Sequence, residues 1–211
     1  MGFQKRLSAG KFIVLAEMNT PKGVNISELV TNARRIKGRV DAVVIPDMDN
    51  GVMRMSALAG GALMHQNSIE PIIHIYGRDR NRMAIQGDIL AANVLGIQNI
   101  IVLEGEPMNA GDHVDAKTVD DLDEWEIFRA IQSLQRGVDM AGFELNGAPS
   151  FTVGCTIGPW SDDEGLEKEL EKTKKKVEAG AGFVLAPSVF DLDRFSSFMD
   201  RAKGLGVPII P

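Results

Sequence analysis

The stretch Phe12-Ile13-Val14-Leu15-Ala16-Glu17 decides the fold class, because it is an unbroken apolar run followed directly by a carboxylate. Such a run is typical of a strand that is covered on both faces, as in parallel sheets. Further along, Asn25 and Glu28 have the spacing of a capping box, and apolar residues then recur at helical spacing until Gly38. The segment therefore predicts a strand followed by a helix.

The same unit recurs along the chain. Six further apolar runs have the length of strands, at residues 42–45, 71–75, 99–103, 151–155, 182–186 and 207–210. Helical spacing separates them, at about residues 52–66, 85–94, 122–140, 166–177 and 195–202. Alternating strands and helices with short links predict parallel strands joined by right-handed crossovers.

Two architectures fit this alternation. An open doubly wound sheet is one, but its Gly-x-Gly-x-x-Gly fingerprint is absent from the sequence, and repeats this even favour a TIM-type (β/α) barrel. We therefore expect a single (β/α) barrel domain over residues 1–211. A complete barrel has eight units in about 250 residues. Since the seventh run ends the sequence, we expect an incomplete barrel whose C-terminal part is missing.

Composition limits the kinds of partner. Acidic residues outnumber basic ones by 29 to 23, which gives a net charge of -6 and argues against a nucleic-acid binder. Cys155 is the single cysteine, so no disulfide can form within the chain and a reducing compartment is expected. No signal peptide or membrane span is predicted, because no apolar run approaches about 20 residues. We expect a cytoplasmic protein without a metal site, since the spacing of His and Cys matches none.

Polar residues follow the predicted strands where catalytic groups of such barrels lie. They are Glu17, Asp47, Asp49, His74, Arg78, Glu104, Glu106, Thr156, Ser188 and Asp191. Glu17 is the most informative, because a carboxylate that continues a buried strand is costly unless it is paired or used. A structural ion pair with an arginine is the plainer interpretation, and we favour a functional role.

The segment Arg78-Asp79-Arg80-Asn81-Arg82 precedes a predicted helix. Three arginines at a helix N-terminus favour an anion site, because guanidinium groups and free backbone N–H groups both bind phosphate. A solvated first turn with Asp79 as N-cap explains the segment equally well. Both interpretations stay open at this point.

Several segments together resemble the methylenetetrahydrofolate reductase family, in the form found in one-carbon pathways of anaerobic bacteria. The resemblance covers essentially the whole chain in the right order. The matching segments are residues 16–23, 78–82, 95–100, 105–107, 111–113, 176–181 and 189–191.

The resemblance implies an FAD-dependent oxidoreductase that reduces 5,10-methylenetetrahydrofolate to 5-methyltetrahydrofolate. Glu17 matches the general acid of the family, and Glu106 takes the place of an aspartate close to flavin and folate. Electrons would come from NADH or from an electron-donating partner subunit, and an oligomer is expected. The expected cofactor-binding set joins five positions that match the lining of the flavin with one strand-end carboxylate: His74, Arg78, Gly105, Thr156, Lys176 and Asp47.

This chain departs from the family at three places. Glu106 is one methylene longer than the usual aspartate, Pro46 replaces a threonine, and Ala186-Pro187 replaces Thr-Gln. Proline offers neither a hydroxyl nor an N–H group to a ligand. Two alternatives therefore remain: a catalytically weak folate- or flavin-binding subunit of a one-carbon complex, and a flavin-free, pterin-dependent methyltransferase barrel.

Overall fold

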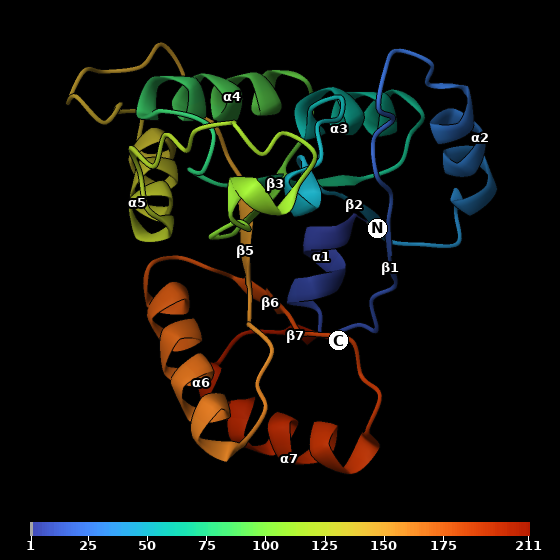
Figure 1. Cartoon of the computed structure of the whole chain (residues 1–211), viewed down its shortest axis with the longest axis vertical. Coiled ribbons are helices and arrows are strands. Elements are labelled where there is room, and N and C mark those ends of the chain that lie inside the picture. Colours follow the sequence, from blue (N-terminus) through green and yellow to red (C-terminus); the bar gives the residue numbers. More distant parts are fainter. Residues whose placement is uncertain (1) are drawn as a thin grey trace.

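The computed structural model describes residues 2–211, which form one parallel sheet with helices around it (Figure 1). The strands follow the order of the sequence: β1 (Leu15–Glu17), β2 (Ala42–Ile45), β3 (Pro71–Ile75), β4 (Asn99–Val102), β5 (Thr152–Thr156), β6 (Phe183–Leu185) and β7 (Ile209–Ile210). The α-helices are α1 (Phe3–Ser8), α2 (Ser27–Ile36), α3 (Ala57–Gln66), α4 (Arg82–Val94), α5 (Glu124–Gln135), α6 (Asp163–Glu178) and α7 (Leu192–Ala202). Short 3₁₀ turns are η1 (Asp49–Gly51), η2 (Met108–Ala110) and η3 (Lys203–Leu205).

The seven parallel strands curve into a half-barrel, as predicted for an incomplete TIM-type barrel. Helices α2 to α7 lie outside the strands, and β1 and β7 are the two edges of the sheet (Figure 1). Each strand pairs with its neighbours in the sequence, for example Ile73 with Ile100 between β3 and β4. The prediction of alternating strands and helices is confirmed.

Burial on both faces explains the continuous apolar runs of the central strands, whereas the run that leads into the edge strand β1 is partly exposed, with Phe12 84% exposed. On β2, Val43 and Ile45 pack towards the helices, whereas Ala42 and Val44 pack towards the barrel interior. All four residues of β2 are buried. Helix-side and interior clusters are thus separated by the strands themselves, as in other parallel sheets.

Helix α1, which the sequence did not reveal, closes the amino end of the barrel. Phe3 and Leu7 are buried in the interior cluster, and the ring of Phe3 meets Phe183 edge to face at 5.3 Å between centroids. The backbone N–H of Phe3 donates to Glu70 at 2.8 Å. Because Glu70 directly precedes β3, α1 lies at the end of the barrel opposite to Glu17.

The interior at mid-height is solid. A Cβ atom on Gly154 would lie 2.3 Å from the ring of Phe183, so the phenyl ring of β6 occupies the space that a side chain on β5 would need. Phe183 itself has no exposed surface. Within the described part of the chain the barrel therefore has no open channel at this height, and the carboxyl end of the strands, where TIM barrels carry their sites, is the place to look for one.

Several predicted element boundaries were wrong. Asn25 does not form a capping box with Glu28, since its side chain accepts from Ser27 at 3.1 Å and α2 begins without a side-chain cap. Helices α3 and α5 are shorter than their apolar patterns suggested, because irregular segments contribute apolar residues to the same core. Within residues 2–211, no helix has both the length and the apolarity to cross a bilayer.

Candidate functional site

The carboxyl end of the sheet carries three inward-facing polar side chains, Glu17, His74 and Thr156, which we call the mouth. Side chains alternate along a strand. Leu15 and Ile72 belong to the interior cluster, so Glu17 and His74, two residues further on, also face inwards. Thr156 follows Gly154 by two residues on β5 and shares that face. The structure thus places these three predicted residues on the inner face of the sheet, at the carboxyl ends of β1, β3 and β5.

Glu17 has the electrostatics of an acid rather than of a structural ion pair. Burial raises the pKa of its carboxyl group above the usual range, and the nearby charge of Asp49 raises it further. Among the described residues, no cation lies within ion-pair distance of Glu17. The arginine partner of the plainer interpretation is therefore not what this fold provides.

His74 is held in its neutral form. Burial lowers the pKa of its imidazole to about 4, because the charged form would lose its hydration. At physiological pH the ring therefore offers one N–H donor and one acceptor nitrogen to a ligand at the mouth.

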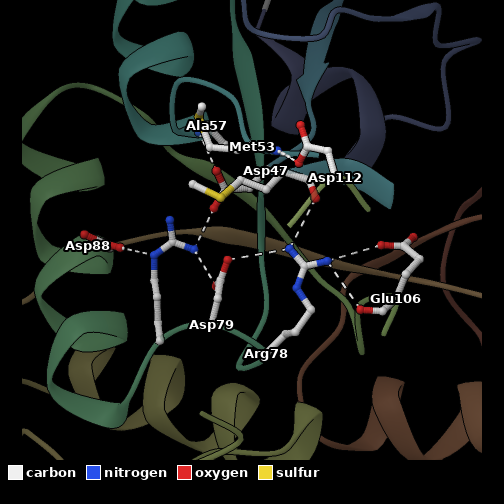
Figure 2. Close-up of polar contacts among 10 residues, drawn as sticks. Asp47, Met53, Ala57, Arg78, Asp79, Asp88, Glu106 and Asp112 are labelled. Atoms are coloured by element: carbon white, nitrogen blue, oxygen red, sulfur yellow. Dashed lines mark hydrogen bonds and ion pairs between the residues drawn. The ribbon is translucent and has the colours of Figure 1, made fainter. Parts of the chain in front are cut away.

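Arg78 connects three loops above β2, β3 and β4 (Figure 2). Its guanidinium donates to the carbonyl of Met48 at 3.2 Å and lies 3.6 Å from the carboxylate of Glu106. It also lies 3.5 Å from the carboxylate of Asp79 and stacks over the ring of Tyr76 at 4.6 Å. Its side chain is only 4% exposed, and its positive charge is balanced mainly by the carboxylates of Asp79 and Glu106.

Asp47 and Arg80 form a second group that faces the helices. One carboxylate oxygen of Asp47 pairs with Arg80 at 2.7 Å, and the other accepts from the backbone N–H of Ala57 at 2.8 Å (Figure 2). Arg80 also pairs with Asp88 at 3.0 Å. The structure does not bring Asp47 to the mouth, and its predicted cofactor role would require both partners to be released.

In the arginine-rich segment, the first turn of α4 is exposed, as the solvated-turn interpretation predicted, but that interpretation named the wrong N-cap. Asn81, not Asp79, is the N-cap of α4, and its side chain accepts from Met83 and Ala84. Arg82 is bound to Asp121 at 2.8 Å. Since Arg78, Arg80 and Arg82 all have carboxylate partners, none is a free anion-binding group in this structure.

Gly105 and Tyr76 form the floor beside Arg78. Gly105 has φ of 86°, a conformation that glycine adopts without strain, and its backbone lies against the ring of Tyr76 and the stem of Arg78. Tyr76 is 3% exposed. Among the described residues, neither its hydroxyl nor Arg78 Nε has a hydrogen-bond partner.

Lys176 lies in a buried ion pair that the sequence did not reveal. Its ammonium group is 2.7 Å from a carboxylate oxygen of Glu124 and donates to the carbonyl of Thr156 at 3.0 Å. Both side chains are about 5% exposed or less. Cys155, beside them, has its thiol pKa raised to about 12, mainly by burial, and is therefore no nucleophile. Lys176 thus ties α5, α6 and β5 together.

The long β4–α5 loop folds back over the end of β2. A Cβ atom on Gly111 would lie 1.8 Å from the carbonyl oxygen of Gly51, so only glycine permits this contact. Asp112 accepts from the backbone N–H of Met53 at 3.1 Å (Figure 2) and pairs with Lys22. The loop is therefore anchored to its neighbours, and a cleft of about 380 Å³ with methionine walls lies beneath it.

Within residues 2–211, no three His, Cys, Asp or Glu side chains are grouped in an arrangement that could hold a metal ion. The sequence also missed Tyr76 as a member of the site. Alternation along β3 could have found it, because it continues the inward series of Ile72 and His74.

A parallel (β/α) half-barrel with an acid, an imidazole and a hydroxyl at the carboxyl ends of its strands has the architecture of the TIM-type barrels, in which the functional residues lie at this end. The family model for methylenetetrahydrofolate reductase matches residues 2–211, so this chain belongs to the methylenetetrahydrofolate reductase family.

Its curated relatives are distant and longer. Methylenetetrahydrofolate reductase 1 of Schizosaccharomyces pombe is 24% identical over 147 residues, which are 68% of this chain and 22% of that protein. Methylenetetrahydrofolate reductase (NADH) 1 of Zea mays is 28% identical over 123 residues, 55% of this chain and 20% of that protein. This chain therefore spans only about a quarter or less of these relatives, and it is a divergent member of the family.

Solved structures agree with the fold. A protein from Clostridium thermocellum, described as binding two copies of 5-methyl-5,6,7,8-tetrahydrofolic acid, superposes with a TM-score of 0.68 at 15% identity, over 98% of this chain and 68% of that one. 2,3-Dimethylmalate lyase superposes with a TM-score of 0.60 at 12% identity, over 99% of this chain and 79% of that one. Similarity at this level concerns architecture alone.

Proposed function

We propose that this chain catalyses the flavin-dependent reduction of 5,10-methylenetetrahydrofolate to 5-methyltetrahydrofolate. The observation that carries the proposal is Glu17, a carboxyl group of raised pKa at the mouth of a barrel of this family. The methyltetrahydrofolate bound by the structural neighbour from Clostridium thermocellum supports a folate as the ligand.

The chemical step requires an acid. The five-membered ring of the substrate opens when a proton is delivered to N10: the bond between N10 and the bridging carbon breaks, and its electron pair remains on N10. The bridging carbon becomes an iminium carbon on N5, which accepts hydride to form the methyl group. Glu17 would deliver this proton, directly or through water, since burial and the nearby charge of Asp49 raise the pKa of its carboxyl group.

Glu106 would stabilise the positive charge of the iminium intermediate. Its carboxylate is 44% exposed and lies 3.6 Å from Arg78, so it can rotate towards a ligand without leaving a buried charge unpaired. A carboxylate near the iminium group stabilises the developing positive charge.

The mouth fits the ring system of a flavin better than it fits the phosphates of FAD. Gly105 presents backbone instead of a side chain, the buried Nε of Arg78 lacks an acceptor, and His74 and Thr156 face the same space. These four residues would hold the ring, which supplies the hydride when bound. For Lys176 to bind a phosphate, it would have to leave Glu124.

The remaining expectations follow from the same assignment. Reducing equivalents would come from NADH or from an electron-donating partner subunit, the protein would work in the cytoplasm, and we expect it to assemble as an oligomer. The match to a relative named as an NADH enzyme supports the first of these donors.

The decisive experiment compares the rate of methylenetetrahydrofolate reduction by wild type and by Glu17→Gln. FAD is added to both proteins and is reduced by a chemical electron donor. Loss of a general acid should lower the rate by about 10²- to 10⁴-fold, while folate binding persists. A Glu17→Gln enzyme that retained wild-type turnover would remove the proposal. Glu178→Gln, an exposed carboxylate at the C-terminal end of α6 and so at the amino end of the barrel, serves as the matched control.

One observation favours a catalytically weak member as the second candidate. In the free protein the carboxylate of Glu106 is paired with Arg78 at 3.6 Å. In addition, Pro46 and Pro187 offer no hydrogen-bond donor at the strand ends. Under this alternative, Glu106→Asp combined with Pro187→Gln should raise turnover from a very low level. Efficient turnover by the unaltered protein would rule it out.

A further inference from the structure

Tyr76 is a buried side chain whose polar end is left without a partner. Its hydroxyl accepts and donates no hydrogen bond within residues 2–211, although only 3% of the residue is exposed. Leaving such a group unpaired costs about 1–3 kcal/mol, so nearly all buried hydroxyls in proteins have a partner in protein, water or ligand.

A second orphan lies beside it. The guanidinium of Arg78 stacks over the ring of Tyr76 at 4.6 Å, and its Nε–H is buried and unpaired as well. Both groups are hydrogen-bond donors. Two adjacent buried donors without an acceptor indicate that the missing partner carries acceptor atoms.

The position of this pair points to a ligand of the mouth. Tyr76 directly follows β3 at its carboxyl end, two residues after His74, and the backbone of Gly105 lies against its ring. The charges nearest the phenol are Arg78, Asp47, Asp79 and Glu106, and together with burial they leave its pKa raised, so the hydroxyl remains a neutral donor.

We propose that the Tyr76 hydroxyl, with Arg78 Nε beside it, donates hydrogen bonds to the carbonyl and ring-nitrogen edge of the bound heteroaromatic ring. This inference rests on the proposed function and names a ligand-positioning residue for it. These two donors would supply hydrogen bonds to the ligand that Pro46 and Pro187 cannot supply, because proline has no N–H group and no polar side chain. A pterin and an isoalloxazine share this acceptor edge, so either ring satisfies the same chemistry.

The chain offers a clean spectroscopic test, because Tyr76 is its only tyrosine. Protein labelled with [13Cζ]tyrosine gives one ζ-carbon resonance, to be followed in separate titrations with 5-methyltetrahydrofolate and with FAD. Binding itself is measured independently by tryptophan fluorescence. We expect the resonance to shift saturably with one of these ligands or both, and the arm that shifts it identifies the ring.

Two variants separate ligand positioning from structural support. Tyr76→Phe should weaken binding of that ligand by about two- to tenfold, the effect of one hydrogen bond, and should leave the melting temperature of the free protein unchanged or higher. Thr152→Val removes a hydroxyl from the amino end of β5 and should leave affinity unchanged.

The outcomes distinguish this inference from the proposed function. Ligand binding without a shift, or a Tyr76→Phe protein with wild-type affinity, overturns the role of Tyr76 and leaves Glu17 untouched. A free Tyr76→Phe protein that melts earlier and binds normally also overturns it, because the hydroxyl would then be structural. If neither ligand binds the wild type, the proposed function fails together with the inference.

Discussion

The two ends of the barrel are built for different purposes. At the amino end, α1 inserts Phe3 and Leu7 into the interior, where they meet Phe183. At the carboxyl end, Glu17 and His74 follow inward-facing positions of β1 and β3, and burial raises the pKa of Glu17 and lowers that of His74. Packed apolar contacts lie at one end and the proposed ligand site at the other, which is the division expected of TIM barrels.

This difference predicts opposite responses to substitution. A change at the amino end should cost stability and spare chemistry, because it removes packed apolar surface. A change at the mouth should cost chemistry and spare stability, or even improve it, because polar groups there are held in environments that suit a ligand better than they suit folding. The predictions below test this contrast.

Phe3→Ala should produce the largest loss of stability. Phe3 has no exposed surface and its ring contacts Phe183, so truncation leaves a cavity in the interior cluster. We expect the free energy of unfolding to fall by about 3–5 kcal/mol, measured by urea denaturation. Folate affinity per folded molecule, measured at low temperature, should stay unchanged; a parallel loss of affinity would show that the two ends are coupled.

Lys176→Met tests the buried pair between the two regions. Removing the ammonium group leaves Glu124 buried without its partner, which should cost about 3–5 kcal/mol of stability. The double variant Lys176→Met with Glu124→Leu should recover most of this loss, because an apolar pair of similar volume needs no hydration. Equal stability of the single and double variants would contradict the pairing.

Much of the fold could be predicted because it is periodic. Each strand is a continuous apolar run and each helix repeats its apolar residues, so the order of elements follows from the sequence. Helix α1 could not be found in this way. It has six residues and owes its burial to a barrel that forms from segments far away in the sequence.

The site was predictable only where one strand decides the direction of a side chain. Glu17, His74 and Thr156 follow inward positions on their own strands. Asp47 was placed in the same set but lies on the helix side, and the alternation after Val44 could have shown this. The partnership of Glu124 with Lys176 joins residues far apart in the sequence, and no local pattern indicates which of many charges will meet.

The smallest expected effect concerns the stability of Glu17→Gln as a function of pH. The pKa of Glu17 is raised, so the folded protein holds this proton more tightly than the unfolded chain does. As pH rises from 4.5, the ordinary pKa of a glutamate, through the folded pKa, the unfolded chain loses its proton first and the free energy of unfolding falls. Glu17→Gln removes this loss and should be more stable than wild type at pH 7, but not at pH 3.

Glu104→Gln is the matched control, because its pKa is shifted in the opposite direction. A hydrogen bond from Lys172 lowers the pKa of Glu104, so its contribution to stability is present at neutral pH and disappears as pH falls through the folded pKa. This variant should therefore be less stable than wild type at pH 7. Thermal unfolding at both pH values compares the two. If Glu17→Gln were destabilised at pH 7 in the same way as Glu104→Gln, Glu17 would be a structural carboxylate, and the separation of the two ends of the barrel would fail at its most important residue.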